Sequence, residues 1–120
     1  MSPRKWHFRL EDMVKSARKI TEYVEGLTFE DFASDEKTFD AVIRQLIILG
    51  EAASHVPDEL SCCAPAIPWS EIRGIRNIIV HEYFGVNIEI IWRTATNNIK
   101  ELLPMLESLQ RQVANGNQGG

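Results

Sequence analysis

Four side chains suited to chemistry lie within eight positions of the sequence: Arg76, Asn77, His81 and Tyr83. Arg is charged throughout the physiological pH range and can bind a phosphate through two parallel hydrogen bonds. His is the side chain whose ordinary pKa best suits it to transfer protons near pH 7. A site that cleaves a phosphodiester without a metal needs both functions, so Arg76 and His81 are the catalytic candidates.

Helix geometry limits how these side chains can meet. If the segment is helical, Arg76 and His81 lie about 140° apart around the axis and roughly 7.5 Å apart along it. Asn77 and His81 are four positions apart and therefore neighbours on the helix surface. A long Arg side chain could still reach a phosphate near His81, especially close to a helix end, which Gly85 indicates.

Arg73 and Asn77 are the candidates for binding substrate. Arg73 could join Arg76 in one positive patch, and Asn77 could orient a phosphate or contact His81. Each has a structural alternative: Asn77 as an ordinary polar surface residue, and Arg76 as the ion-pair partner of Glu71 or Glu82.

Composition indicates one globular domain. The chain has 120 residues, of which 44% are hydrophobic and 25% charged, which is ordinary for a folded domain with a single core. No apolar stretch reaches the ~18 residues of a membrane span, and the first residues lack the apolar core of a signal peptide. We therefore expect a cytoplasmic protein without a membrane partner. The only cysteines, Cys62 and Cys63, are adjacent, so we expect reduced thiols, no disulfide framework and no metal site.

Charge is unevenly distributed along the chain. The formal net charge is −4. Residues 1–19 carry six basic and two acidic groups, or +4; residues 20–60 carry two basic and ten acidic groups, or −8. These runs can be solvated helix faces, or the first helix can be a basic element beside the site that steers a polyanion. The sequence leaves both open.

The first half of the chain has helical periodicity. Apolar residues recur every three or four positions between Arg4 and Glu25, and Gly26 is a natural end for that helix. Thr28 can cap a short helical turn, and Asp35 can cap a second long helix that ends before Pro57. The small residues at 50–53 would let another helix approach closely.

The second half continues this pattern. Three prolines mark residues 57–68 as a connector with one helical turn near 58–61. Ile72, Ile75, Ile78 and Ile79 then drive the helix that carries the motif. Asn87 can cap a last helix, which Pro104 should kink or divide.

The expected fold is therefore all-α, an up-and-down bundle of four or five helices. Residues 1–113 form the single domain. Residues 114–120, Ala-Asn-Gly-Asn-Gln-Gly-Gly, are expected to be a disordered tail.

The spacing Arg76-x4-His81-x-Tyr83 resembles the motif of HepT-like toxins within the HEPN superfamily. Similar stretches extend over roughly residues 8–110. They are Tyr23-Val-Glu-Gly-Leu, Asp40-Ala-Val-Ile-Arg44, Ile48-Leu-Gly-Glu-Ala52, Ile67-Pro-Trp69 and His81-Glu-Tyr-Phe-Gly-Val86.

This resemblance implies a function and its partners. It implies a metal-independent endoribonuclease, without cofactor, that acts as the toxin of a toxin–antitoxin pair. The active unit would be a homodimer in which the Arg76 and His81 side chains of both chains form one RNA-cleaving site that leaves a 2′,3′-cyclic phosphate. Tyr83 would be the residue that an MntA-like nucleotidyltransferase antitoxin adenylylates to silence the toxin.

Two alternatives belong to other classes of protein. One is a non-catalytic helical module that binds a nucleotide or a nucleotidyltransferase. The other is a metal-dependent bundle, for which Glu51 and His55 are the candidate ligands at helical spacing. The second is weak, because bundle di-metal sites use Glu-x-x-His twice and that pattern is absent.

Overall fold

The computed structural model describes residues 3–82 and 87–119, without the side chains of residues 3–6, 80–82 and 116–119. Every regular element in these ranges is helical. The elements are α1 (Pro3–Val24), α2 (Phe29–Ala33), α3 (Glu36–Ser54), α4 (Asp58–Ser61), α5 (Trp69–Glu82), α6 (Ile88–Arg93), a π-helical stretch (Thr94–Asn98) and α7 (Ile99–Gly119).

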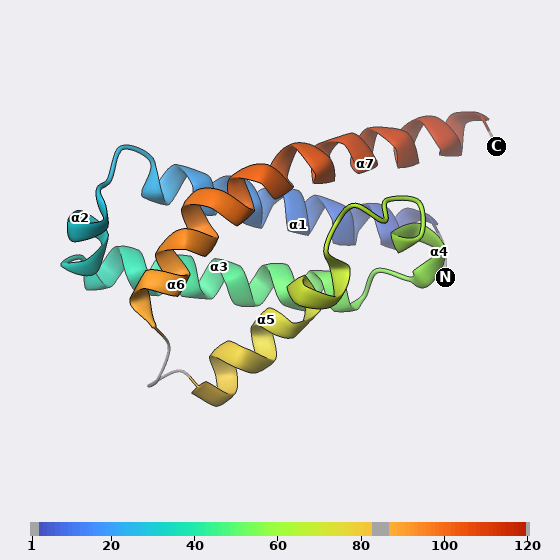
Figure 1. Cartoon of the computed structure of the whole chain (residues 1–120). Coiled ribbons are helices and arrows are strands. Elements are labelled where there is room, and N and C mark those ends of the chain that lie inside the picture. Colours follow the sequence, from blue (N-terminus) through green and yellow to red (C-terminus); the bar gives the residue numbers. More distant parts are fainter. Residues whose placement is uncertain (1–2, 83–86, 120) are drawn as a thin grey trace.

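The long helices run alternately up and down, as expected for a helical bundle (Figure 1). Helix α1 packs against both α3 and α7, and α3 packs in turn against α5. Helix α5 diverges from the other long helices toward its C-terminal end (Figure 1). The prediction of an all-helical fold is confirmed.

Local sequence signals set several helix ends where they were predicted. Gly26, just beyond α1, has a φ of 78°, a left-handed conformation that glycine adopts without strain. Thr28 and Asp31 form a reciprocal capping box at α2. Asp35 caps α3 by accepting hydrogen bonds from the hydroxyl and the backbone N–H of Thr38, which lower the pKa of its carboxyl group. Asn87 caps α6 through two backbone N–H groups.

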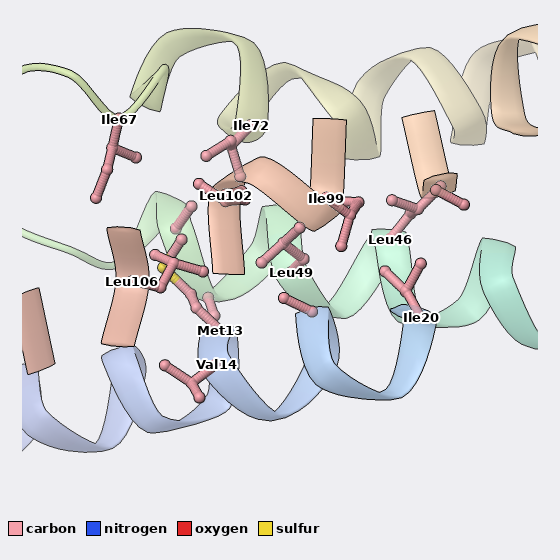
Figure 2. Packing of buried hydrophobic residues seen from close by; sticks show 14 of the residues in the cluster. Met13, Val14, Ile20, Leu46, Leu49, Ile67, Ile72, Ile99, Leu102 and Leu106 are labelled. Carbon is pink, nitrogen blue, oxygen red and sulfur yellow. The ribbon is translucent and has the colours of Figure 1, made fainter. Parts of the chain in front are cut away.

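The core lies where the inner stripes of these helices meet (Figure 2). All five apolar positions that define the periodicity of α1 are buried: Leu10, Met13, Ala17, Ile20 and Val24. They pack with stripes of α3 and α7 that include Leu46, Leu49, Ile99 and Leu106. Fully burying a side chain of this size contributes about 1.5–3 kcal/mol, so these stripes hold the bundle together.

The C-terminal helix α7 continues through Pro104 and is not divided there, and a kink at this residue stays a prediction. The regular α pattern is interrupted earlier, by the π-helical stretch Thr94–Asn98. Pro104 lacks the N–H that would donate to the carbonyl of Lys100, which lies in the first turn of α7, so the affected bond is near the helix start. Helix α7 runs to Gly119, across residues predicted as a tail; Val113 is its last apolar side chain packed on the core.

Candidate active site

Helix α5 carries the motif and approaches α3 closely because position 50 is a glycine. A Cβ atom at Gly50 would lie 3.0 Å from the carbonyl oxygen of Ile72 and 3.3 Å from the amide nitrogen of Arg76. Both distances are tighter than ordinary van der Waals contact. The prediction that the small residues at 50–53 admit another helix is confirmed. The backbone of Arg76 therefore lies on the side of α5 that faces α3.

The Arg76 side chain forms an ion pair with α3. Its Nε lies 3.2 Å from Oε2 of Glu51, and the two side chains are 50% and 51% exposed. The sequence suggested Glu71 or Glu82 as the ion-pair partner. Those residues are five and six positions away along the same helix, whereas facing positions are three or four apart. The partner that the structure shows is a residue of another helix, and the side chain of Glu82 lies outside the described atoms.

This ion pair leaves part of the guanidinium available. Glu51 approaches Nε, and Nη1 and Nη2 make no hydrogen bond or ion pair with the described residues. These two nitrogens form the end edge of the planar group, which matches two oxygens of a phosphate. Arg76 can therefore bind an anion while Glu51 holds its other edge.

Arg73 serves the fold in this structure. Its Nε and Nη2 donate hydrogen bonds of 3.0 and 2.9 Å to the carbonyl oxygens of Ala53, in the last turn of α3, and of Val56, two residues beyond that helix. Its guanidinium also lies over the ring of Trp69, 5.7 Å from the centroid. A cation satisfying carbonyls at the negative end of a helix is a stabilising arrangement. The contact of Arg73 with a substrate stays a prediction.

The other candidate residues, Asn77, His81 and Tyr83, follow Arg76 along the chain. Asn77 is exposed, on the turn that follows Arg73. His81 belongs to the last turn of α5, and its side chain lies outside the described atoms. Tyr83 and Gly85 lie outside the described residues. The structure thus fixes the place of Arg76, Arg73 and Asn77 and leaves how His81 and Tyr83 approach them as a prediction.

Two neighbouring isoleucines of α5 have opposite surroundings. Ile79 is 3% exposed and belongs to the core, whereas Ile78 is 58% exposed. The sequence counted both among the apolar positions of this helix; Ile79 joins the core, whereas Ile78 is apolar surface that packing within the described chain does not use. One turn before Ile78, Gly74 also faces open space: a Cβ there would meet no atom within 4 Å.

A hollow of about 280 Å³ opens beside Arg76, between α1, α3 and α5. Its lining residues are Arg9, Asp12, Ile47, Ile48, Glu51, Ala52 and Arg76. A larger hollow of about 380 Å³ lies on another side of α5, between α5 and the α6–α7 segment. Its charged lining residues are Glu71 and Glu101. Of these two hollows, the first has basic groups among its described lining residues, and the second has none.

The pairing suggested for a metal-dependent bundle does not form. Nδ1 of His55 lies 3.0 Å from the backbone oxygen of Glu51, and the Glu51 carboxylate pairs instead with Arg76. Among the side chains that the structure describes, no group of three His, Cys, Asp or Glu could hold a metal ion. Cys62 and Cys63 are exposed free thiols. No described helix has the length and apolar character that a membrane span requires.

Comparison with known proteins gives the family. A model of the family described as "Ribonuclease HepT-like" matches residues 13–109, a range that includes α5 and the whole motif. The chain belongs to the HepT-like family. A protein of Thermococcus cleftensis named "Probable ribonuclease HepT" is 38% identical over 102 residues, which cover 85% of this chain and 93% of that protein.

Other HepT-like relatives have similar lengths. A protein of Caldanaerobacter subterraneus subsp. tengcongensis, named provisionally as an RNase, is 40% identical over 104 residues, 86% of this chain and 93% of the relative. A protein of Methanocaldococcus jannaschii with a similar name is 33% identical over 110 residues, 88% of this chain and 91% of its own length. No solved structure is a significant match.

Sequence reasoning missed two features of this HepT-like site. It overlooked Glu51 as the partner of Arg76, although Gly50 beside it was a signal for close helix contact. It also assigned no specific role to Arg9 and Asp12, which it counted only in the overall charge of the first helix. Their spacing of three positions indicated one shared helix face, but only the packed bundle places that face beside α5.

Proposed function

We propose that this HepT-like protein is a metal-independent endoribonuclease and the toxin of a toxin–antitoxin pair. One observation carries the proposal. Arg76 projects half-exposed from α5, five positions before His81, and the end edge of its guanidinium has no partner among the described residues; it lies inside the segment that the ribonuclease family model matches. This combination supplies a phosphate-binding cation and a proton-transfer group on one helix.

The proposed reaction uses the ribose 2′-hydroxyl as nucleophile. A His81 imidazole removes the proton of this hydroxyl, and the oxygen attacks the adjacent phosphorus. Arg76 neutralises the charge that builds on the phosphoryl oxygens. The bond from phosphorus to the 5′-oxygen breaks, and a protonated His81 donates a proton to that oxygen. The products are a 2′,3′-cyclic phosphate and a free 5′-hydroxyl, and DNA is not cut because it lacks the nucleophile.

A homodimer would supply the two histidines that act as base and acid. In a two-fold interface, each residue i that contacts residue j of the partner has its contact repeated by symmetry. If two α5 helices cross antiparallel with the axis between positions 78 and 79, Arg76 is level with the partner's His81. The composite site then contains two Arg76 and two His81 side chains.

The exposed face of α5 supports this dimer. Ile78 presents a large apolar side chain to solvent next to the proposed axis, and Gly74 leaves open space one turn away. A glycine inside a helix lowers helix stability by about 1 kcal/mol relative to alanine. No contact within the described chain requires a glycine at position 74. A second helix packed closely against α5 would require one.

The proposed partner is an MntA-like nucleotidyltransferase antitoxin that transfers AMP to Tyr83. An added AMP brings a phosphate charge and a nucleoside two positions from His81. Both compete with RNA, the charge for Arg76 and the nucleoside for space.

Two variants and a matched control test the enzymatic proposal. His81→Ala and Arg76→Ala are each expected to lower the cleavage rate of purified protein on single-stranded RNA by about 10²–10⁴-fold. Arg93→Ala also breaks an exposed ion pair, with Glu89, and should cut at the original rate. Thermal unfolding verifies the fold of each. Wild-type protein that binds but never cuts RNA would favour the non-catalytic binding module instead.

A further inference from the structure

The hollow beside Arg76 brings together charges and apolar surface from three helices. Helix α1 contributes Arg9 and Asp12, α5 contributes Arg76, and α3 contributes Glu51 and the isoleucines 47 and 48. Arg9 and Asp12 are three positions apart and share a face of α1. Ile47 and Ile48 precede Glu51 by four and three positions and share its face of α3. The lining of the hollow thus combines charged side chains with the apolar side chains of Ile47 and Ile48.

Arg9 and Asp12 have no ion-pair or hydrogen-bond partner among the described residues. Arg9 is nevertheless half-buried. A half-buried guanidinium without a partner is incompletely solvated and lacks compensation from the protein, so a ligand anion would improve its surroundings. The remaining charges of the hollow, Arg76 and Glu51, already pair with each other.

The mixture of groups selects for one class of ligand. A simple inorganic anion would be attracted by Arg9 and Arg76 but repelled by Asp12 and Glu51. A nucleotide has a phosphate for a guanidinium, N–H donors on its base for a carboxylate, and an apolar base face for isoleucine side chains. The volume of about 280 Å³ is close to the lower end of the size range of small-ligand pockets.

We propose that this hollow is a subsite for the nucleotide next to the cleaved bond of RNA. Arg9 binds the phosphate on the far side of that nucleotide, its base rests on Ile47 and Ile48, and Asp12 accepts a hydrogen bond from a base N–H. Arg76 stands at the end of the hollow and binds the cleaved phosphate, so this subsite rests on the proposed nuclease function. The basic first helix then contacts the substrate directly.

The test compares Arg9 with an arginine of the same helix outside the hollow. Arg18 is bound to Glu107 of α7 at 2.8 Å. Arg9→Gln and Arg18→Gln are assayed on a hexanucleotide that contains the mapped cleavage bond, and on the dinucleotide cut out around that bond. Arg9→Gln should raise KM for the hexanucleotide about tenfold, the loss typical of one charged hydrogen bond. It should leave the dinucleotide unaffected, because that substrate has no second phosphate.

The salt dependence gives a second readout. Removing one phosphate contact should reduce the slope of log affinity against log salt by about 0.7 for a single strand. Arg18→Gln should change neither KM nor this slope. Equal values for the Arg9 and Arg18 variants on the hexanucleotide would overturn the subsite.

Asp12 gives an independent variant with little risk to the fold, since its side chain is exposed. Asp12→Asn adds N–H donors to an acceptor-only group, so the preference among the four bases next to the cleaved bond should change. Glu107→Gln is the matched control and should keep the original preference. An unchanged preference in Asp12→Asn would show that the base does not contact Asp12.

Binding is measured in parallel with the 2′-deoxy hexanucleotide, which cannot be cut. This measurement separates the two proposals. If wild-type protein binds the deoxy oligonucleotide but cuts no RNA, the nuclease proposal fails, and the loss of binding in Arg9→Gln still tests the subsite. If the protein cuts RNA and Arg9→Gln binds and cuts as Arg18→Gln does, the subsite alone fails.

Discussion

Glu51 Oε2 lies 3.2 Å from Arg76 Nε, and this ion pair joins the motif helix to α3. Because both side chains are half-exposed, the pair contributes only about 0–1 kcal/mol to stability. Its greater consequence is geometric. A carboxylate beside Nε restrains the guanidinium near α3 and leaves its two terminal nitrogens without a partner among the described residues, so they can accept a phosphate.

The first prediction concerns this orientation. Glu51→Ala should lower kcat/KM for RNA by about two- to tenfold, since ordering a long side chain costs about 0.5–1.5 kcal/mol. Glu51→Gln keeps an oxygen acceptor, so its kcat/KM should fall by less than that of Glu51→Ala. Steady-state kinetics and thermal unfolding are the measurements. Glu89→Ala breaks the comparable pair with Arg93 and is the control; faster cleavage by Glu51→Ala would mean that Glu51 competes with the phosphate.

The second prediction concerns Arg73. Arg73→Met removes two charged hydrogen bonds from the end of α3 and should lower the free energy of unfolding by about 1–3 kcal/mol. Urea unfolding measures it. Arg93→Met, on an exposed pair, should change it by less than about 0.5 kcal/mol. A stable Arg73→Met variant with weakened RNA binding would instead favour the substrate contact predicted from the sequence.

The third prediction concerns the chemistry. Because Arg76 neutralises charge and His81 moves protons, cleavage should persist in EDTA and yield 2′,3′-cyclic phosphate ends. Mass spectrometry of the fragments identifies the ends, and an all-DNA strand of the same sequence is the control. Activity that disappears with chelator and returns with Mg²⁺ would contradict the mechanism.

The fourth prediction concerns assembly. Ile78→Glu should convert a dimer into a monomer and remove cleavage, because it places charge in the proposed apolar interface. Light scattering at micromolar concentration measures the mass. Ile90 is equally exposed, at 58%, but lies on α6, so Ile90→Glu should remain dimeric.

Gly74→Ala distinguishes the interface from the fold. It should stabilise the isolated helix by about 0.5–1 kcal/mol, yet weaken a close-packed dimer. A wild-type protein that is monomeric while it cuts RNA would rule out the composite site.

The fifth prediction concerns inactivation by the antitoxin. After incubation with the cognate nucleotidyltransferase, ATP and Mg²⁺, the intact mass should increase by one or more AMP groups, with the first on Tyr83. Tyr83→Phe should abolish the modification. Tyr23 is the only other tyrosine of the chain and is partly exposed, so Tyr23→Phe should be modified normally. Peptide mapping that places AMP only on other residues would refute this assignment.

The sequence by itself determined the class of fold and most helix ends. Periodicity every three or four residues is a local property, and caps such as Thr28, Asp35 and Asn87 act on backbone groups within three positions. The motif spacing was likewise enough to suggest the family, which comparison with known proteins then established.

Tertiary structure alone decided which side chains meet across helices. The approach of α3 to α5 at Gly50 determines that Arg76 pairs with Glu51 and that Arg73 reaches the carbonyls of α3. It also divides the apolar positions of α5 into buried Ile79 and exposed Ile78. The physical reason is that periodicity defines the faces of each helix, whereas its rotation and distance relative to a neighbour depend on packing of side chains far apart in sequence.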